Sequence, residues 1–164
     1  MRSSDSALTA IEGVYRERYP VFLRVVVGVV GDEEVAREAV HDGFVRAVRH
    51  RRRFRRSGSL EAWLWRIVVN EARKRRSRER RLTSVDVSFE RLVSDPSRNG
   101  GGEDVRALIA ALPQRQRLAL FLRYYADLDY RAIAEALDVK PGTVAATLNA
   151  AHATLRKRLE EVPR

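Results

Sequence analysis

The 164-residue chain has no cysteine, and it has no long uninterrupted apolar run. The absence of cysteine excludes disulfide bonds, cysteine-ligated zinc and thiol catalysis, and it fits a reducing compartment. The most apolar run, residues 21–30, is interrupted by Arg24 and is too short to span a bilayer. The first fifteen residues contain acids and no apolar segment of the kind that signal peptides carry. We therefore expect a cytoplasmic protein without membrane insertion.

Catalytic and metal-binding patterns are also missing. The three histidines are far apart in the sequence, so no metal site is expected. No Ser-His-Asp set or paired-carboxylate pattern can be named, and no glycine-rich phosphate loop is present. The sequence therefore predicts a protein that is not an enzyme and that needs no cofactor.

What the chain does have is a concentration of positive charge in residues 46–81. This stretch holds 15 Lys and Arg against 3 Asp and Glu, a net charge of +12, whereas the whole chain is +10. The remainder is therefore slightly acidic, and the basic character is local, as on a surface built for a polyanion. Within the stretch, apolar residues recur at the spacing of one helix face: Leu60, Trp63, Leu64, Ile67 and Val68. The sequence therefore predicts a packed helix that carries charge.

Helical periodicity continues through the first half of the chain. Residues 7–19 have roughly helical spacing, and Pro20 is expected at a helix start or break. Residues 21–30 are β-branched, but we expect a helix there because no second strand exists to pair with it. Asp32 is a predicted N-cap for a helix over residues 33–50, and Ser59 for a helix over residues 60–80.

The second half begins after a segment typical of a linker. Residues 82–103 contain scattered apolar residues, Asp95-Pro96, and glycines near the end, so we expect flexibility there. Helices are predicted over residues 107–112, ended by Pro113, and over residues 118–125. Asp129 is expected to cap a third helix, and Pro141 to begin the last one. These last two helices form a helix-turn-helix pattern. The fold class predicted is all-α, with two small helical domains, residues 8–81 and 104–162, joined by a flexible linker.

Two motifs in this order resemble a known family. The first is VHDGFVRA (residues 40–47) followed by FRRSGSLEAWLWRIVVNEARKRR (residues 54–76), and the second is ALPQRQRLALFLRYYADLDYRAIAEALDVKPGTV (residues 111–144). Together they resemble region 2 and region 4 of the extracytoplasmic-function sigma factors, which are small bacterial promoter-recognition subunits. The resemblance implies that region 2 binds core RNA polymerase and the melted −10 element, and that region 4 reads the −35 element. It implies no enzymatic activity of the subunit itself.

The resemblance also implies a polymerase-facing side of the helix over residues 33–50. The matching positions are Glu38, His41, Asp42, Phe44 and Arg46. Glu38, Asp42 and Arg46 are separated by four residues each and form one ridge able to make salt links across an interface. His41 replaces the glutamine usual in the family, and for Phe44 packing in the core is the stronger interpretation.

By the same resemblance, the residues after His50 face the −10 element. The loop that pockets a flipped base matches Phe54, Arg55, Arg56 and Ser57, and the DNA-facing helix matches Asn70, Arg73 and Lys74. Basic grooves with aromatic stacking hold single strands. For Phe54, filling the core beneath the loop is an equal alternative. Trp63 lies on the apolar stripe and is expected in the core, whereas Trp65 lies outside it and is the better candidate for a nucleic-acid contact, with half-buried packing as the alternative. Lys74 stands where the family often has Asp.

Region 4 departs further from the family pattern. The candidates for −35 contact are Lys140, Thr143, Thr147, Asn149 and Arg156. The recognition helix has no Arg before Arg156, and Arg bound to guanine is the commonest direct readout of a base. Alanines stand at several of the usual contact positions. The hypothesis is weak or AT-leaning −35 recognition.

Three interpretations stay open at this point. The first is a sigma factor, with core RNA polymerase and promoter DNA as partners and with an anti-sigma factor as a further expected partner. The second is a stand-alone helix-turn-helix regulator, against which the polymerase-facing pattern argues. The third is a sigma-like protein that has lost −35 reading and acts mainly through protein contacts, and the alanine-rich recognition helix keeps this interpretation open.

Overall fold

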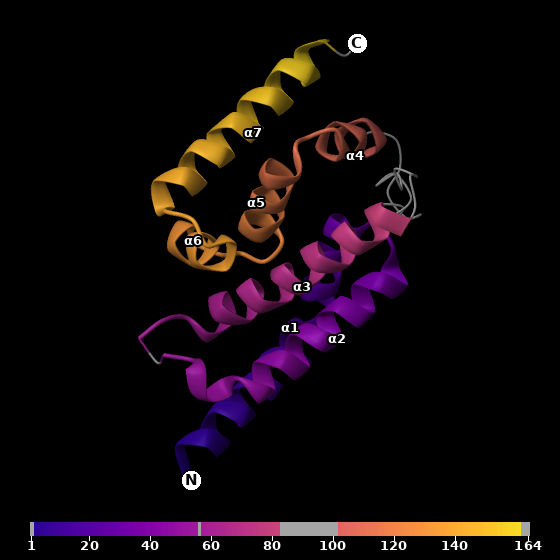
Figure 1. Ribbon diagram of the computed structural model, residues 1–164. Helices are drawn as coiled ribbons and strands as arrows, with labels where there is room; N and C mark the ends of the chain where they lie inside the picture. Colours follow the sequence, from indigo (N-terminus) through magenta and orange to yellow (C-terminus); the bar gives the residue numbers. More distant parts are fainter. Residues whose placement is uncertain (1, 56, 83–101, 162–164) are drawn as a thin grey trace.

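The computed structural model describes residues 2–55, 57–82 and 102–161, and this part of the chain is helical without a strand. Figure 1 shows the N-terminal helices forming one layer, across which the C-terminal helices pack, with the two termini at opposite ends. The helices are α1 (Arg2–Val30), α2 (Glu33–Arg49), the short η1 (Arg51–Arg53), α3 (Leu60–Leu82), α4 (Gly102–Ala110), α5 (Gln114–Tyr124), α6 (Tyr130–Leu137) and α7 (Pro141–Glu161). The all-α fold class is thus confirmed. The predicted flexibility of the linker falls on residues 83–101, which lie outside the described residues.

The prediction of a start or break at Pro20 was wrong, because α1 runs through it as one helix of 29 residues. Proline removes one intrahelical hydrogen bond, but Pro20 is exposed, and buried residues on both sides of it belong to the same core. Ile11 lies before the proline, and Phe22, Val25 and Val26 lie after it. Packing of this stripe outweighs the local cost. Helix α1 ends at Val30, and the next residue, Gly31, has a φ of 88°, a conformation that favours glycine.

The core of the N-terminal unit is built on a stack between α1 and α3. The rings of Phe22 and Trp65 lie 3.8 Å apart at centroids, with an angle of 12° between their planes, and both side chains are fully buried. Phe44 of α2 meets Phe22 edge-on at 5.1 Å. Gly43 lets α2 approach α3 closely, because a β-carbon there would lie 2.7 Å from Val68 Cγ2.

The assignment of the two tryptophans was therefore wrong. Trp65 is in the core, whereas Trp63 is only partly buried and packs against Phe54. Helix α3 has more apolar positions than one stripe, and its most buried face runs through Trp65, Val68, Val69 and Ala72. Two helices, α1 and α2, cover that face. A contact of Trp65 with nucleic acid is excluded by this burial.

Most of the predicted helix signals are confirmed. Asp32 accepts a hydrogen bond from Val35 N at 2.9 Å, Ser59 from Ala62 N at 3.2 Å, and Asp129 from Ala132 N at 2.8 Å. Pro141 is the first residue of α7. The helix expected over residues 107–112 instead occupies Gly102–Ala110, and Pro113 is the N-cap of the next helix.

The C-terminal unit packs directly on the N-terminal unit. Helix α6 contacts α3, α5 contacts α1, and the buried residues of both units belong to one hydrophobic cluster. Arg18 of α1 joins the two units, since it donates to Ala126 O at 2.5 Å and to Glu61 Oε1 of α3 at 3.1 Å. Among the described residues, no helix has the length and apolar character needed to cross a membrane.

Substitution of the two tryptophans tests this core. We expect Trp65→Ala to lower the free energy of unfolding by about 3–5 kcal/mol, because it removes a fully buried ring from a stack. Trp63→Ala is the control and is expected to lose about 1–2 kcal/mol, as for a partly buried side chain. Urea denaturation followed by far-UV circular dichroism measures both values. Equal losses would contradict the burial pattern.

Candidate nucleic-acid and polymerase interface

The ridge of α2 that the sequence assigned to a polymerase contact is exposed, and α3 holds it in place. Arg75 of α3 pairs with Glu38 at 2.5 Å and also with Asp42. Burial by itself lowers the pKa of Arg75, but hydrogen bonds to Asp42 and Glu38 outweigh it, so the pKa is raised. Arg46 pairs with Glu71 at 2.9 Å. These interhelical pairs fix the orientation of the ridge relative to α3.

His41 and Phe44, the other two predicted polymerase-contact residues of α2, lie beside an open groove. Phe44 is buried, as the stronger interpretation had it, whereas His41 is exposed. Both line a groove of about 570 Å³ between α1 and α2, together with Ile11, Tyr15 and Val45 and with further residues of both helices. An exposed polar ridge next to an apolar groove is a surface suited to a protein partner.

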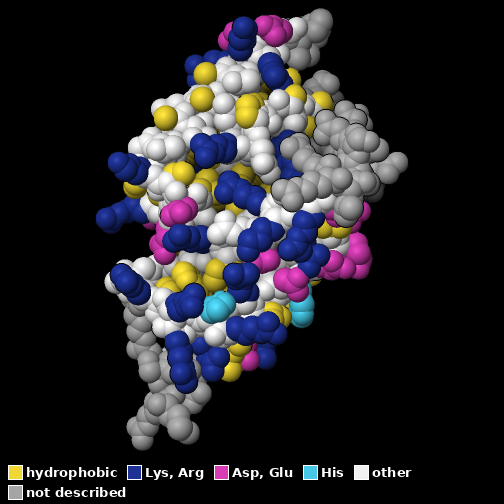
Figure 2. Space-filling view, in the orientation of Figure 1, with side chains coloured by type: hydrophobic (Ala, Val, Ile, Leu, Met, Phe, Trp, Pro, Cys, Tyr) yellow, Lys and Arg dark blue, Asp and Glu magenta, His cyan; other side chains and the backbone are white. Residues whose placement is uncertain are grey.

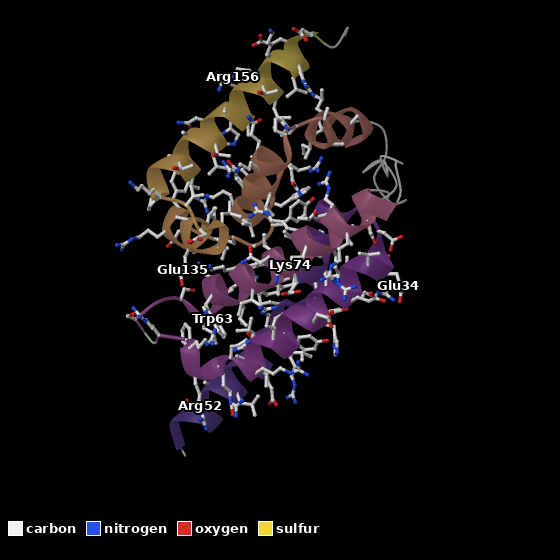
Figure 3. All side chains as sticks on the ribbon, viewed as in Figure 1. Glu34, Arg52, Trp63, Lys74, Glu135 and Arg156 are labelled. Carbon is white, nitrogen blue, oxygen red and sulfur yellow. The ribbon has the colours of Figure 1, made fainter. Side chains whose placement is uncertain are left out.

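The loop between η1 and α3 presents basic and polar side chains. Arg55 and Ser57 are exposed, whereas Arg56 lies outside the described residues. Phe54 is half-buried and lies 5.4 Å from the Trp63 ring at an angle of 47°. The aromatic pair supports the base of the loop and leaves part of Phe54 accessible. Figure 3 shows Trp63 beneath this loop.

A polar ridge continues from the loop along α3. Asn70 and Lys74 are exposed, and Lys74 pairs with Glu71 at 3.3 Å. Arg73 is half-buried, and its pKa is lowered by burial and then by the nearby guanidinium of Arg115. Arg66 belongs to the same ridge, which sequence reasoning missed. Its spacing to Asn70 and Arg73, four and seven residues, is the helical signal that indicates it.

The candidates for −35 contact lie on or next to α7. Lys140 precedes the helix and its carbonyl accepts hydrogen bonds from Thr143 N and Val144 N. Thr143 and Asn149 are exposed, and Thr147 is half-buried with its hydroxyl donating to Thr143 O at 2.7 Å. Arg156 is exposed near the far end of α7, as Figure 3 shows, well beyond the turn with α6.

One polar pair of the helix-turn-helix unit was also missed. Tyr124 of α5 and His152 of α7 are 2.9 Å apart between Oη and Nε2, and both sit at the surface of the unit. Neither residue has a characteristic sequence spacing to the other, so only the fold reveals the pair. It ties α7 to α5.

Basic side chains gather on the face shown in Figure 2, over α3 and the segment around η1, whereas a group of acidic ones lies toward the start of α2 and others lie over α6 and at the end of α7. The geometry defines a two-part helical protein. One part combines a basic ridge with an aromatic-supported loop, and the other is a helix-turn-helix. Such a combination is typical of proteins that bind nucleic acid through phosphates and bases.

Comparisons with known proteins agree with this class. The family described as sigma-70 region 2 matches residues 14–82, and the family described as sigma-70, region 4 matches residues 102–155. The RNA polymerase sigma-H factor of Pseudomonas aeruginosa is 28% identical over 87% of this chain and 82% of its own. The sigma factor YlaC of Bacillus subtilis is 26% identical over 97% of this chain and 95% of its own. The ECF sigma-E factor of Escherichia coli K12 is 29% identical over 77% of this chain and 75% of its own.

Two solved structures share the fold. A structure of CnrH in complex with the cytosolic domain of CnrY has a TM-score of 0.72 and 18% identity, covering 99% of this chain and 95% of that one. The sigma factor RpoE of Bartonella quintana, in complex with the anti-sigma factor NepR, has a TM-score of 0.65 and 21% identity. The match covers 93% of this chain and 99% of that one. The chain belongs to the sigma-70 family, as an extracytoplasmic-function sigma factor that directs promoter recognition.

The exposed ridge of α3 predicts a salt-dependent effect of Lys74. In holoenzyme, Lys74→Ala is expected to weaken binding to a DNA fork that carries only the −10 region, and to lower the slope of log affinity against log salt by about 1. The reason is the loss of one phosphate contact from an exposed ammonium group.

Lys157→Ala is the matched control, because it removes the same charge from an exposed position on α7. Fluorescence anisotropy across a salt series measures both variants. An unchanged slope for Lys74→Ala would contradict the assignment of this ridge to DNA.

Proposed function

We propose that residues 8–81 form the unit that binds core polymerase and the −10 element, that residues 82–103 are a linker, and that residues 104–162 form the unit that faces the −35 element. The observation that carries the proposal is the pairing of Arg75 with Glu38 and Asp42. The pairing fixes the exposed ridge of α2, which is suited to a protein partner, relative to the ridge of α3, which is suited to phosphates. A polymerase bound to α2 would thus present α3 to the DNA that it opens.

The polymerase contact in this proposal uses Glu38, His41, Asp42 and Arg46, with Phe44 supporting them from the core. The carboxylates of Glu38 and Asp42 are half-exposed, and each can bind a second cationic partner because each oxygen accepts more than one hydrogen bond. The apolar groove beside His41 adds area that a partner helix can bury.

The −10 contact in this proposal uses the loop before α3 and the ridge along it. Phe54 offers a partly exposed ring to a base. Arg55 and Ser57 of the same loop are exposed, and we assign Arg56 to the same contact from its place in the sequence. Asn70, Arg73 and Lys74 then follow the strand, and we add Arg66 to them. Arginine and lysine contacts to phosphate set position without reading sequence.

The −35 contact is proposed to be weak. Thr143 and Asn149 are exposed and can reach bases, whereas the Thr147 hydroxyl already donates within the helix. Lys140 and Arg156 are exposed, and we assign both to phosphates. Without an arginine in the first half of α7, no bidentate pair with guanine forms there, and such a pair is worth about 1–3 kcal/mol.

A protein inhibitor is the further partner that we propose. One structural neighbour is a sigma factor solved with an anti-sigma factor, and the other was solved with the cytosolic domain of a partner. The proposal extends that mode of control to this chain. Working with RNA polymerase places the protein in the cytoplasm, and the chemistry of transcription is assigned to the polymerase.

Run-off transcription with purified protein, core RNA polymerase and genomic DNA fragments tests this function. We expect discrete start sites that require the protein. Because α7 has no guanine-reading arginine, replacing the −35 region of such a promoter should reduce transcript by less than about tenfold, and replacing the −10 region should abolish it. Specific duplex binding without any association with polymerase would instead establish a stand-alone regulator.

A further inference from the structure

One carboxylate of α3 lies between the surface proposed for polymerase and the surface proposed for DNA. Glu71 Oε1 accepts a hydrogen bond from Arg46 Nη1 of α2 at 2.9 Å and another from Lys74 Nζ of α3 at 3.3 Å. The Glu71 side chain is only 15% exposed, whereas the side chains of Arg46 and Lys74 are about half exposed. A single, largely buried oxygen atom therefore binds two cations that face solvent.

Arg46 keeps this carboxylate beneath the ridge of α3. The Arg46–Glu71 pair crosses from α2 to α3, and Arg75, on the next turn of α3, is also paired with α2. Glu71 is therefore a fixed acceptor. The ammonium group of Lys74 is carried on a flexible aliphatic stem, so it can move between Glu71 and a group outside the protein. Figure 3 shows Lys74 farther along α3 from the preceding loop than Trp63.

The pair between Lys74 and Glu71 is weak enough to exchange. The two residues are three positions apart on one helix, and exposed pairs of this kind contribute little to stability. A DNA phosphate is an alternative anion for the ammonium group, and the contact also releases counterions from the DNA. Lys74 can therefore leave Glu71 for a phosphate, but the pair with Glu71 must be given up each time.

This exchange separates strands that carry the −10 bases from other strands. A phosphate contact has no sequence information, so a lysine without an acidic neighbour strengthens binding to any DNA. A strand whose bases are held by the loop and by Asn70 presents its phosphate to Lys74 at a high effective concentration. A strand of unrelated sequence is not held there, and its phosphate competes poorly with a carboxylate 3.3 Å from the ammonium group.

We propose that Glu71 is a specificity-determining residue of the −10 contact. Its carboxylate retains Lys74 against strands of unrelated sequence, and it releases Lys74 to a phosphate when the −10 bases hold the strand beside α3. This inference rests on the proposed −10 role of Asn70 and Lys74. It adds a function for an acidic side chain on a surface otherwise assigned to basic and polar ones.

Replacement of the carboxylate by an amide tests this role. Glu71→Gln retains the size of the side chain and removes the anionic partner of Lys74. Fluorescence anisotropy of the holoenzyme is measured across a salt series with two forked DNAs, one with the −10 bases and one with those bases replaced. For the replaced-base fork we expect affinity to rise about twofold to threefold and the salt slope to steepen by about 1. For the −10 fork the slope is expected to stay unchanged, because Lys74 already contacts a phosphate there.

Two controls separate the release of Lys74 from a general change in charge. Glu17→Gln makes the same change in net charge at an exposed position of α1, and it is expected to leave both slopes unchanged. In the Lys74→Ala background, Glu71→Gln is expected to affect neither fork, because the lysine that it would release is absent. A gain that persists in this background would overturn the proposal, since the freed charge would then belong to Arg46 or to the surface as a whole.

Two further results would overturn the proposal: no gain for the replaced-base fork, or an equal gain for both forks. Wild type and Lys74→Ala, compared on the −10 fork, separate this inference from the proposed function. If Lys74→Ala lowers the slope on that fork, either of these results refutes the role of Glu71 alone. If the slope on that fork does not depend on Lys74, the proposed contact of the α3 ridge with DNA is itself refuted.

Discussion

The stack of Trp65 on Phe22 is the interaction on which the rest of the structure depends. It joins α3 to α1 at the centre of the core, and edge-on contact of Phe44 with Phe22 brings in α2. With that face of α3 fixed, its rotation about its own axis is fixed as well. The ridge through Arg66, Asn70 and Lys74 must then point away from the α1–α2 pair. The placement of the charged groups follows from the burial of an uncharged ring.

Charge is the second constraint, because residues 46–81 concentrate +12 in a short segment. Three acidic residues outside this segment form ion pairs with its arginines: Glu38 and Asp42 pair with Arg75, and Asp138 pairs with Arg66. The first two pairs orient the ridge of α2 within the N-terminal unit. The third crosses to the C-terminal unit. The pairs within one unit orient the candidate site, and the third pair links the two units.

Much of the fold could be predicted from the sequence, because its signals are local. The caps at Asp32, Ser59 and Asp129 and the helix start at Pro141 each depend on a few neighbouring residues. Pro20 was assigned wrongly because its local cost is outweighed by burial of residues far along the chain. Trp65 was assigned wrongly because α3 is apolar on more than one side, and periodicity does not tell which side is covered. Among the described residues, most of the predicted site residues on α2, α3 and the loop between η1 and α3 are exposed. Phe44 and Trp65 are buried, and Phe54 and Arg73 are half-buried. The spacing of Arg66 to Asn70 places it on the same ridge, but its pairing with Asp138, which is remote in sequence, could not be predicted.

The central claim is that α3 and its preceding loop hold the opened −10 strand once α2 is bound to polymerase. The most direct measurement is the fluorescence of a 2-aminopurine base placed in the −10 element of a promoter used by the holoenzyme. The account predicts an increase in fluorescence when the protein and core polymerase are added together, and a reduced increase with Phe54→Ala. Fluorescence that stays at the duplex level, while the protein remains bound to polymerase on that promoter, would contradict it.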